Sequence, residues 1–170
     1  MKKRVVKKHN AAKGCFICGV DNPCGLHAEF YELEDGTLAA RVTPKERHQS
    51  YPGRVHGGIS TALLDETIGR AINVAEPDTW AVTVEITTRY KKPVPYDVPL
   101  TVVGKVLKNS HRLFTAEGAI LLPDGEVAVT ATGTYMKLPL ERIADFDAAG
   151  ETWEQYPCEA DPQWIDVPEE

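Results

Sequence analysis

Short segments that alternate apolar and polar residues recur along this chain, and turn residues separate them. The alternation is clearest over residues 80–91, which we predict to be a strand with one apolar face and one polar face. The sequences "EDG" at 34–36 and "PDG" at 123–125 are typical of hairpin turns. The pattern predicts strands over residues 28–33, 38–43, 80–91, 99–107, 112–122 and 126–138. In 80–91 the apolar face would hold Trp80, Val82, Val84, Ile86 and Tyr90, and the polar face Thr83, Glu85, Thr87, Arg89 and Lys91.

Residues 57–75 have a different pattern, in which apolar side chains fall on more than one side of a helix. A helix with this pattern is buried over most of its surface. Pro77 lacks a backbone donor and ends the pattern. The strongly polar positions within it are Asp65, Glu66, Arg70 and Asn73.

The order of these elements predicts the fold. Two strands precede the helix and four follow it, with no second long helical pattern between them. A helix that is apolar nearly all round must be covered, and a curved antiparallel sheet is the natural cover. We therefore predict an α+β protein in which a curved antiparallel sheet wraps around one central helix, the arrangement called the hotdog fold.

Length and charge divide the chain into three parts. The 170 residues fit one domain. Residues 139–170 hold ten acidic residues and one basic residue (net −9), whereas residues 1–138 hold eighteen basic and fifteen acidic residues (net +3). We expect a flexible basic arm over 1–14, the hotdog domain over 15–138 and a solvated acidic extension over 139–170.

Composition also excludes some classes of protein. No apolar run reaches the roughly 20 residues of a membrane span. The basic N-terminus is not followed by an apolar stretch, so we expect no signal peptide and a cytoplasmic location. The body lacks the strong basic excess of a nucleic-acid-binding protein.

The helix start and one carboxylate carry the candidate chemistry. Residues 54–70 read "RVHGGISTALLDETIGR". A helix N-terminus offers unpaired N–H groups, and Gly57 and Gly58 let a ligand approach them. Asp65 lies in a largely apolar run, where burying a carboxylate is costly unless it has a hydrogen-bonding partner or a functional role. Its neighbour Glu66 has Arg70 four residues on, so a surface ion pair explains that acid.

This stretch resembles the hotdog-fold acyl-CoA thioesterases, which implies thioester hydrolysis, and these features suit that reaction. Backbone donors at Gly57 would bind the oxyanion of the tetrahedral intermediate, each donor contributing about 3–4 kcal/mol. Asp65 would act as general base or as nucleophile. Thr61 and Gly69, one turn before and after it, leave a notch on that face. Gly57 and Asp65 are eight residues apart, roughly 12 Å along a helix, so we predict that the two groups of each site come from different subunits of a homodimer.

The sequence "VHGGISTALLDE" resembles the hotdog-fold acyl-CoA thioesterases, and among them the PaaI-like branch of the 4-hydroxybenzoyl-CoA thioesterase superfamily. "CFICGVDNPCGLH", "HQSYPGRVHGG" and "TVEITTRYKKPVP" are similar to further segments of that branch, so the resemblance covers about 15–138. It implies a CoA thioester substrate, a homodimer or homotetramer, and no required cofactor. Many relatives have Asn or Gln six residues before the histidine. Here Ser50 occupies that position beside Gln49, and either is a candidate.

Further candidates support these groups. His56 is expected to position the loop before the helix. Thr83 is a candidate for holding the attacking water, or an ordinary strand residue. The CoA phosphates could bind at either of two basic groups, or these could be solvated strand ends. The first is Arg89, Lys91 and Lys92, and the second is Lys108, His111 and Arg112.

The cysteine-rich segment allows a second interpretation. Cys15, Cys18, Cys24 and His27 form the spacing C-x2-C-x5-C-x2-H, which a structural zinc ion could use. The alternative is a reduced cysteine pair that packs the N-terminal segment onto the sheet. Two functional alternatives to an enzyme therefore remain: a non-catalytic acyl-CoA or lipid-binding regulator, and a zinc-bearing interaction module on a hotdog dimer.

Overall fold

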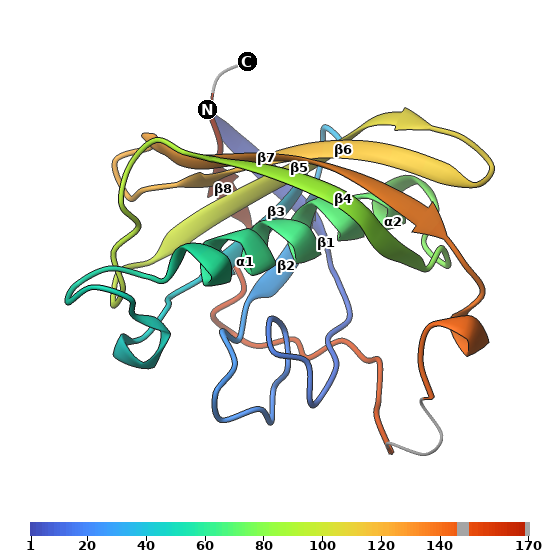
Figure 1. The fold of residues 1–170 in the computed structure, drawn as a ribbon, viewed down its shortest axis with the longest axis horizontal. Helices are drawn as coiled ribbons and strands as arrows, with labels where there is room; N and C mark the ends of the chain where they lie inside the picture. The colour runs from blue at the N-terminus through green and yellow to red at the C-terminus, as the bar shows by residue number, and fades with distance from the viewer. Residues whose placement is uncertain (146–149, 169–170) are drawn as a thin grey trace.

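A long helix lies in the concave side of a curved sheet in the computed structural model, which describes residues 1–145 and 150–168 (Figure 1). The helix is α1 (Gly57–Arg70), and a short turn of helix, α2 (Ile72–Ala75), follows it. The strands are β1 (Lys2–Lys8), β2 (Glu29–Leu33), β3 (Leu38–Val42), β4 (Ala81–Tyr90), β5 (Leu100–Asn109), β6 (Leu113–Leu121), β7 (Val127–Lys137) and β8 (Trp164–Asp166). Short 3-10 turns occur at Glu46–His48 and Leu140–Arg142.

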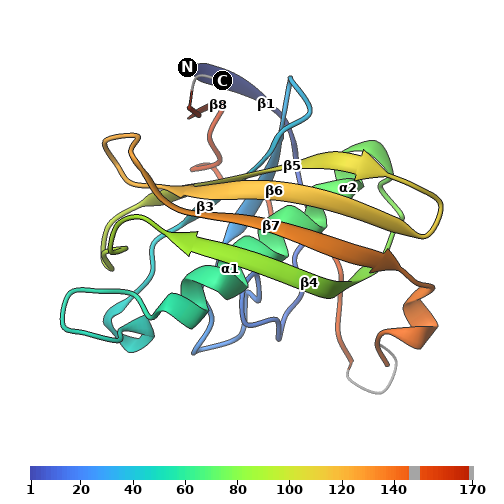
Figure 2. The same cartoon turned by 45° about the horizontal axis from the view of Figure 1, so that its top comes forward.

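Within the described residues the eight strands form one antiparallel sheet in the order β4-β7-β6-β5-β3-β2-β1-β8. Figure 2 shows α1 running beneath β4 to β7. Leu63, Leu64 and Ile68 of α1 are almost fully buried against the sheet. The α+β class and the hotdog arrangement predicted from the pattern are therefore confirmed, and each of the six predicted strands lies within two residues of its expected bounds.

The predicted alternation of residues 80–91 is wrong at one point. The register between β4 and β7 shifts between Thr83 and Glu85, so Val84 is an extra residue in a β-bulge. Val84 is 56% exposed, whereas Thr83 makes a hydrogen bond to the helix. The bulge therefore places Thr83 and Ile86 on the same, helix-facing side, although the sequence pattern put them on opposite faces.

The expectation of a flexible arm over residues 1–14 is also wrong, because Lys2–Lys8 form β1. This strand pairs with β2 on one side and β8 on the other. Val5 packs into a small second core with Tyr31, Leu33, Ala39 and Ile165. A strand with so few apolar residues looks like a basic tail in the sequence, but the sheet provides partners for its backbone.

The acidic extension returns to the body of the protein and is not a solvated tail over the part described. Glu151 accepts backbone N–H groups of Lys13 and Gly14 at 2.5 and 2.9 Å. Asp161 accepts a hydrogen bond from Lys8 at 2.5 Å. Acidic side chains of the extension thus fasten it to Lys8 of β1 and to the loop that follows this strand. Residues 146–149 and 169–170 of this predicted segment lie outside the described residues. No helix in the described part is long and apolar enough to span a membrane.

Candidate active site

The first part of the site is the start of α1. His56 is the N-cap residue, and its Nδ1 accepts the N–H of Gly58 at 2.9 Å. Its carbonyl accepts the N–H groups of Ile59 and Ser60. The Gly57 N–H makes no hydrogen bond to another described residue. His56 therefore caps the helix and leaves Gly57 rather than Gly58 as the available donor.

A cavity of about 450 Å³ opens beside this helix start. Its lining includes Gly57, Ser50, Tyr90, Lys91 and Lys92. The Tyr90 hydroxyl donates to the Gly57 carbonyl at 2.8 Å and so ties β4 to the first turn of the helix. An anion would meet the N-terminal end of the helix dipole and two lysines here.

The two candidate loop residues have different positions. Ser50 lines the cavity, and its N–H donates to the Arg54 carbonyl at 2.9 Å. Gln49 pairs with Val55 in an isolated β-bridge and is exposed, and it is not part of the cavity lining. A buried His48 fixes this loop, because its Nδ1 accepts the N–H of Lys45 and its Nε2 donates to the Cys24 carbonyl. Of the two residues, Ser50 has the better position for substrate.

The second part of the site is Asp65, which is half-buried in the middle of α1. The Thr83 hydroxyl lies 2.9 and 3.1 Å from its two carboxylate oxygens. The Tyr135 hydroxyl donates to Oδ1 at 2.9 Å. Among the described residues no Lys, Arg or His forms an ion pair with it. Asp65 is thus oriented by neutral hydroxyl groups and has no ion-pair partner in the described part of the chain.

Tyr135 is the site residue that the sequence did not reveal. It is buried and stacks on Phe114 with ring centroids 5.0 Å apart. Burial first, and then the Asp65 carboxylate, raise the pKa of Tyr135 above its usual range, so the hydroxyl remains a donor. A Cβ at Gly69 or Gly133 would lie 2.8 or 2.7 Å from the tyrosine ring. The ring therefore fills the notch expected beside Gly69. In the sequence, only the two glycines could have indicated that a large side chain packs there.

The remaining basic candidates do not join one group. Arg89 lines a groove of about 960 Å³ on the outer face of the sheet, away from α1. Arg112 lies in the turn between β5 and β6, beside His111 and Lys108. Lys91 and Lys92 line the cavity at the helix start, where Lys92 also pairs with Glu126. The expected cluster of Arg89 with the two lysines is therefore split between the two faces of the sheet.

The four-residue zinc set predicted in the N-terminal segment does not form. The group of possible ligands that includes Cys15 and Cys18 is completed by Glu66 of α1. Cys24 and His27 lie outside it, and both are exposed. The physical reason is the fold of the segment, because the backbone turns tightly after Cys15 and carries the later two residues to the surface.

Comparison with known proteins agrees with this fold. The family model described as "Thioesterase superfamily" matches residues 52–129. A protein of Saccharolobus solfataricus named as an esterase, SSO2140, is 28% identical over 65% of this chain and 78% of its own length. The solved structure of RHA08564, a thioesterase superfamily protein, is 33% identical with a TM-score of 0.66. The match covers 73% of this chain and 60% of that one.

Two further structures are informative. BH2602 of Bacillus halodurans, solved with CoA, is 29% identical with a TM-score of 0.54 over 59% of this chain and 66% of its own. The E. coli PaaI protein, 17% identical, shares the fold with a TM-score of 0.61 over 67% of this chain and 81% of its own. The fold and the family match support a thioester hydrolase of the hotdog type. Residues 52–129 match the thioesterase superfamily, and the resemblance found in the sequence is confirmed.

Proposed function

We propose that the protein hydrolyses acyl-CoA thioesters, with Asp65 as the catalytic carboxylate and the Gly57 N–H as the oxyanion donor. The observation that carries this proposal is the environment of Asp65. Its carboxylate is oriented by Thr83 and Tyr135 and is not neutralised by a cation among the described residues. A carboxylate that is held in place and still charged suits a general base or a nucleophile.

The chemistry needs the two parts of the site together. As a base, Asp65 takes a proton from water, and the hydroxide attacks the thioester carbon. Negative charge develops on the former carbonyl oxygen, where the Gly57 N–H donates to it. The C–S bond then breaks, and the CoA thiolate takes up a proton. As a nucleophile, Asp65 instead attacks the carbon itself, and water hydrolyses the resulting anhydride. Thr83, beside the carboxylate, is placed to orient the water in either case.

The distance within one chain supports a site shared between subunits. Gly57 and Asp65 are separated by eight helical residues, roughly 12 Å, so one carbonyl cannot contact both. β4 is an edge strand whose outer side has no partner strand in the described part of the chain. An unpaired edge of this length is a surface on which a second copy can pair. We propose a homodimer in which Gly57 of one protomer meets the partner subunit's Asp65.

Binding of CoA is supported by charge at the helix start. Lys91 and Lys92 line the same cavity as Gly57, so their positive charges would attract the CoA phosphates, from which the pantetheine arm extends to the thioester. BH2602, with a related sequence and fold, was solved with CoA. A homotetramer and a cytoplasmic location remain predictions.

The first test is release of free CoA thiol from aryl, short-chain and long-chain acyl-CoAs. The wild type is expected to turn over part of this panel and Asp65→Ala to be inactive on it. Ser50 stands where many relatives have an amide side chain, which favours one alternative, a non-catalytic acyl-CoA-binding regulator. If the protein is a folded dimer that binds acyl-CoA saturably without turnover, this alternative is correct and the proposal fails.

A second test addresses the shared site. Gly57→Pro removes the proposed donor at the first helical position, where proline is tolerated. His56 has φ −61° and ψ 136°, which suits a residue before proline. Each single variant is expected to be inactive. Co-expressed Asp65→Ala and Gly57→Pro chains form mixed dimers with one intact site, so about a quarter of wild-type activity should return. A site within one chain would give no recovery.

A further inference from the structure

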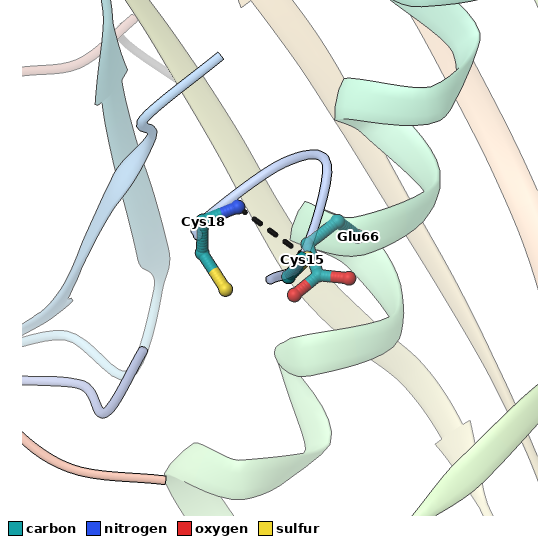
Figure 3. Close-up of side chains that lie close together, drawn as sticks. All are labelled: Cys15, Cys18 and Glu66. Atoms are coloured by element: carbon teal, nitrogen blue, oxygen red, sulfur yellow. Dashed lines mark hydrogen bonds between the residues drawn. The ribbon is translucent and has the colours of Figure 1, made fainter. Parts of the chain in front are cut away.

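Two cysteines and a glutamate converge on the side of α1 that faces away from Asp65. Figure 3 shows Cys15 and Cys18 on the N-terminal loop and Glu66 on the helix beside them. One ligand atom from each of the three lies within 4.8 Å of the others. Cys18 is almost fully buried, and Cys15 and Glu66 are half-buried. The proposed hydrolysis does not use this cluster.

The loop is shaped around the Cys15 sulfur. Backbone N–H groups of Ile17 and Cys18 approach Sγ at 3.3 and 3.5 Å, and the Gly19 N–H donates to the Cys15 carbonyl at 2.9 Å. A Cβ at Gly19 would lie 2.2 Å from that carbonyl oxygen, so the turn requires glycine there. N–H donors directed at sulfur stabilise a thiolate, which is the form that binds metal.

A buried arginine supports the other two groups. Arg70 donates to the Cys18 sulfur at 3.4 Å and also pairs with Glu66. Its guanidinium is fixed between the rings of Phe30 and Trp153, at 4.2 and 4.7 Å from their centroids. In metal sites, partners outside the ligand shell hold the ligands in a fixed orientation in this way.

The charges of the cluster would balance around a divalent cation. Once metal binding has displaced the thiol protons, two thiolates and one carboxylate would carry three negative charges, and Arg70 supplies a single positive charge. A divalent ion between the three ligands would bring the total to zero. Thiolate ligands together with a carboxylate favour zinc over calcium or magnesium. Zn–S bonds of about 2.3 Å place two sulfurs roughly 3.8 Å apart in a tetrahedral site, so the side chains need to move by only about 1 Å.

We infer that Cys15, Cys18 and Glu66 form a structural zinc site that fastens the N-terminal loop to the central helix. Water would complete the tetrahedron. The ligand set contains neither Cys24 nor His27, so it differs from the one suggested by sequence spacing alone.

The test is zinc content of the reduced full chain, measured by native mass spectrometry after incubation with zinc and gel filtration. The wild type is expected to retain about one zinc per chain, and Cys18→Ser and Glu66→Gln to lose most of it. Cys24→Ser is the matched control, because this exposed cysteine lies on the same loop, and it should retain the metal. Loss of zinc in Cys24→Ser, or a wild type that retains none, would overturn the inference.

A second measurement needs no variant and so does not depend on variant folding. The half-buried Cys15 can be alkylated in the native protein, whereas zinc should protect it. Exposed Cys24 and Cys158 should react equally with and without zinc. Cobalt in place of zinc should give a thiolate charge-transfer band in the near ultraviolet. Equal labelling of Cys15 in both states, or a Cys15–Cys18 disulfide in protein kept under reductant, would contradict a zinc site.

Discussion

Asp65 and Glu66 are adjacent carboxylates with opposite surroundings. Asp65 faces β4 and β7 and accepts hydrogen bonds from the hydroxyls of Thr83 and Tyr135. Glu66 faces the N-terminal loop, where it pairs with buried Arg70 and lies beside two cysteines. One helix therefore separates a carboxylate that is held without a counter-charge from one whose charge is balanced. The first arrangement suits chemistry, and the second suits stability.

The largest expected effect is on turnover and concerns Asp65. Asp65→Asn keeps the size of the side chain but removes its basicity, so kcat should fall roughly a thousand-fold. The measurement is CoA thiol release, with circular dichroism to confirm that the variant is folded. If the variant keeps more than about a tenth of the wild-type kcat, another group carries out the chemistry. Asp65 would then not differ from Glu66 in having a catalytic role.

The complementary change is expected to act on stability. Glu66→Ala leaves the buried Arg70 guanidinium without its carboxylate partner, which should lower the free energy of unfolding by about 3 kcal/mol. Urea unfolding measured under identical metal conditions gives this value. Turnover should fall far less than in Asp65→Asn. A Glu66→Ala protein as stable as the wild type would show that this side of the helix does not depend on the ion pair.

The Arg70 side of the helix should also govern stability in mild acid. Burial first, and then the positive charges of Arg70 and Lys7, lower the pKa of His9 from 6.5 to about 4. The unfolded chain therefore takes up a proton between these pH values before the native state does, and stability falls as pH drops from 6.5 to 4. The Glu32 carboxylate lies 3.6 Å from His9 Nε2 and stabilises the protonated imidazole, which offsets part of the destabilisation. We therefore expect the free energy of unfolding to fall by about 2 kcal/mol over this pH range.

Urea unfolding at a series of pH values tests this expectation. His9→Gln should flatten the profile between pH 6.5 and 4. His111→Gln, which changes an exposed histidine, is the control and should leave the profile unchanged. If both variants keep the wild-type slope, carboxylates rather than His9 are responsible for it.

The smallest effect is expected from Tyr135→Phe, which removes one of the two hydroxyl donors to Asp65 but keeps the ring. The carboxylate would be less well oriented, so kcat should fall about ten-fold with little change in KM. Because the Phe114 stacking partner is retained, the unfolding midpoint should move little. A raised KM with an unchanged kcat would instead place Tyr135 in substrate binding.

The sequence predicted most of this fold because its main strands and its buried helix follow simple periodicities. It failed where the partner of a segment was distant. Lys2–Lys8 has too few apolar residues to look like a strand, yet β2 and β8 pair with it. The bulge at Val84 could not be seen either, because a shift in register depends on the neighbouring strand.

The site was predicted to a similar degree. His56, Gly57 and Asp65 could be recognised as candidates in the sequence. Glycines at a helix start and a carboxylate in an apolar run are unusual features that a short stretch of sequence reveals. Tyr135 was not, because it follows the alternation of its strand and resembles any buried aromatic residue. Its role depends on a contact between residues 70 positions apart. The group formed by Cys15, Cys18 and Glu66 was missed for the same reason, because Glu66 joins the cysteines only in three dimensions.

The tyrosine ring between Gly69 and Gly133 has an evolutionary consequence. Neither glycine can gain a side chain while the ring is present, and the ring has no room to move elsewhere without a repacked core. The three positions should therefore change together among relatives. Lineages that keep tyrosine here should keep both glycines, and lineages with a smaller residue should be free to replace them. A triplet of this kind would mark, in sequences alone, the relatives that hold their carboxylate in the same way.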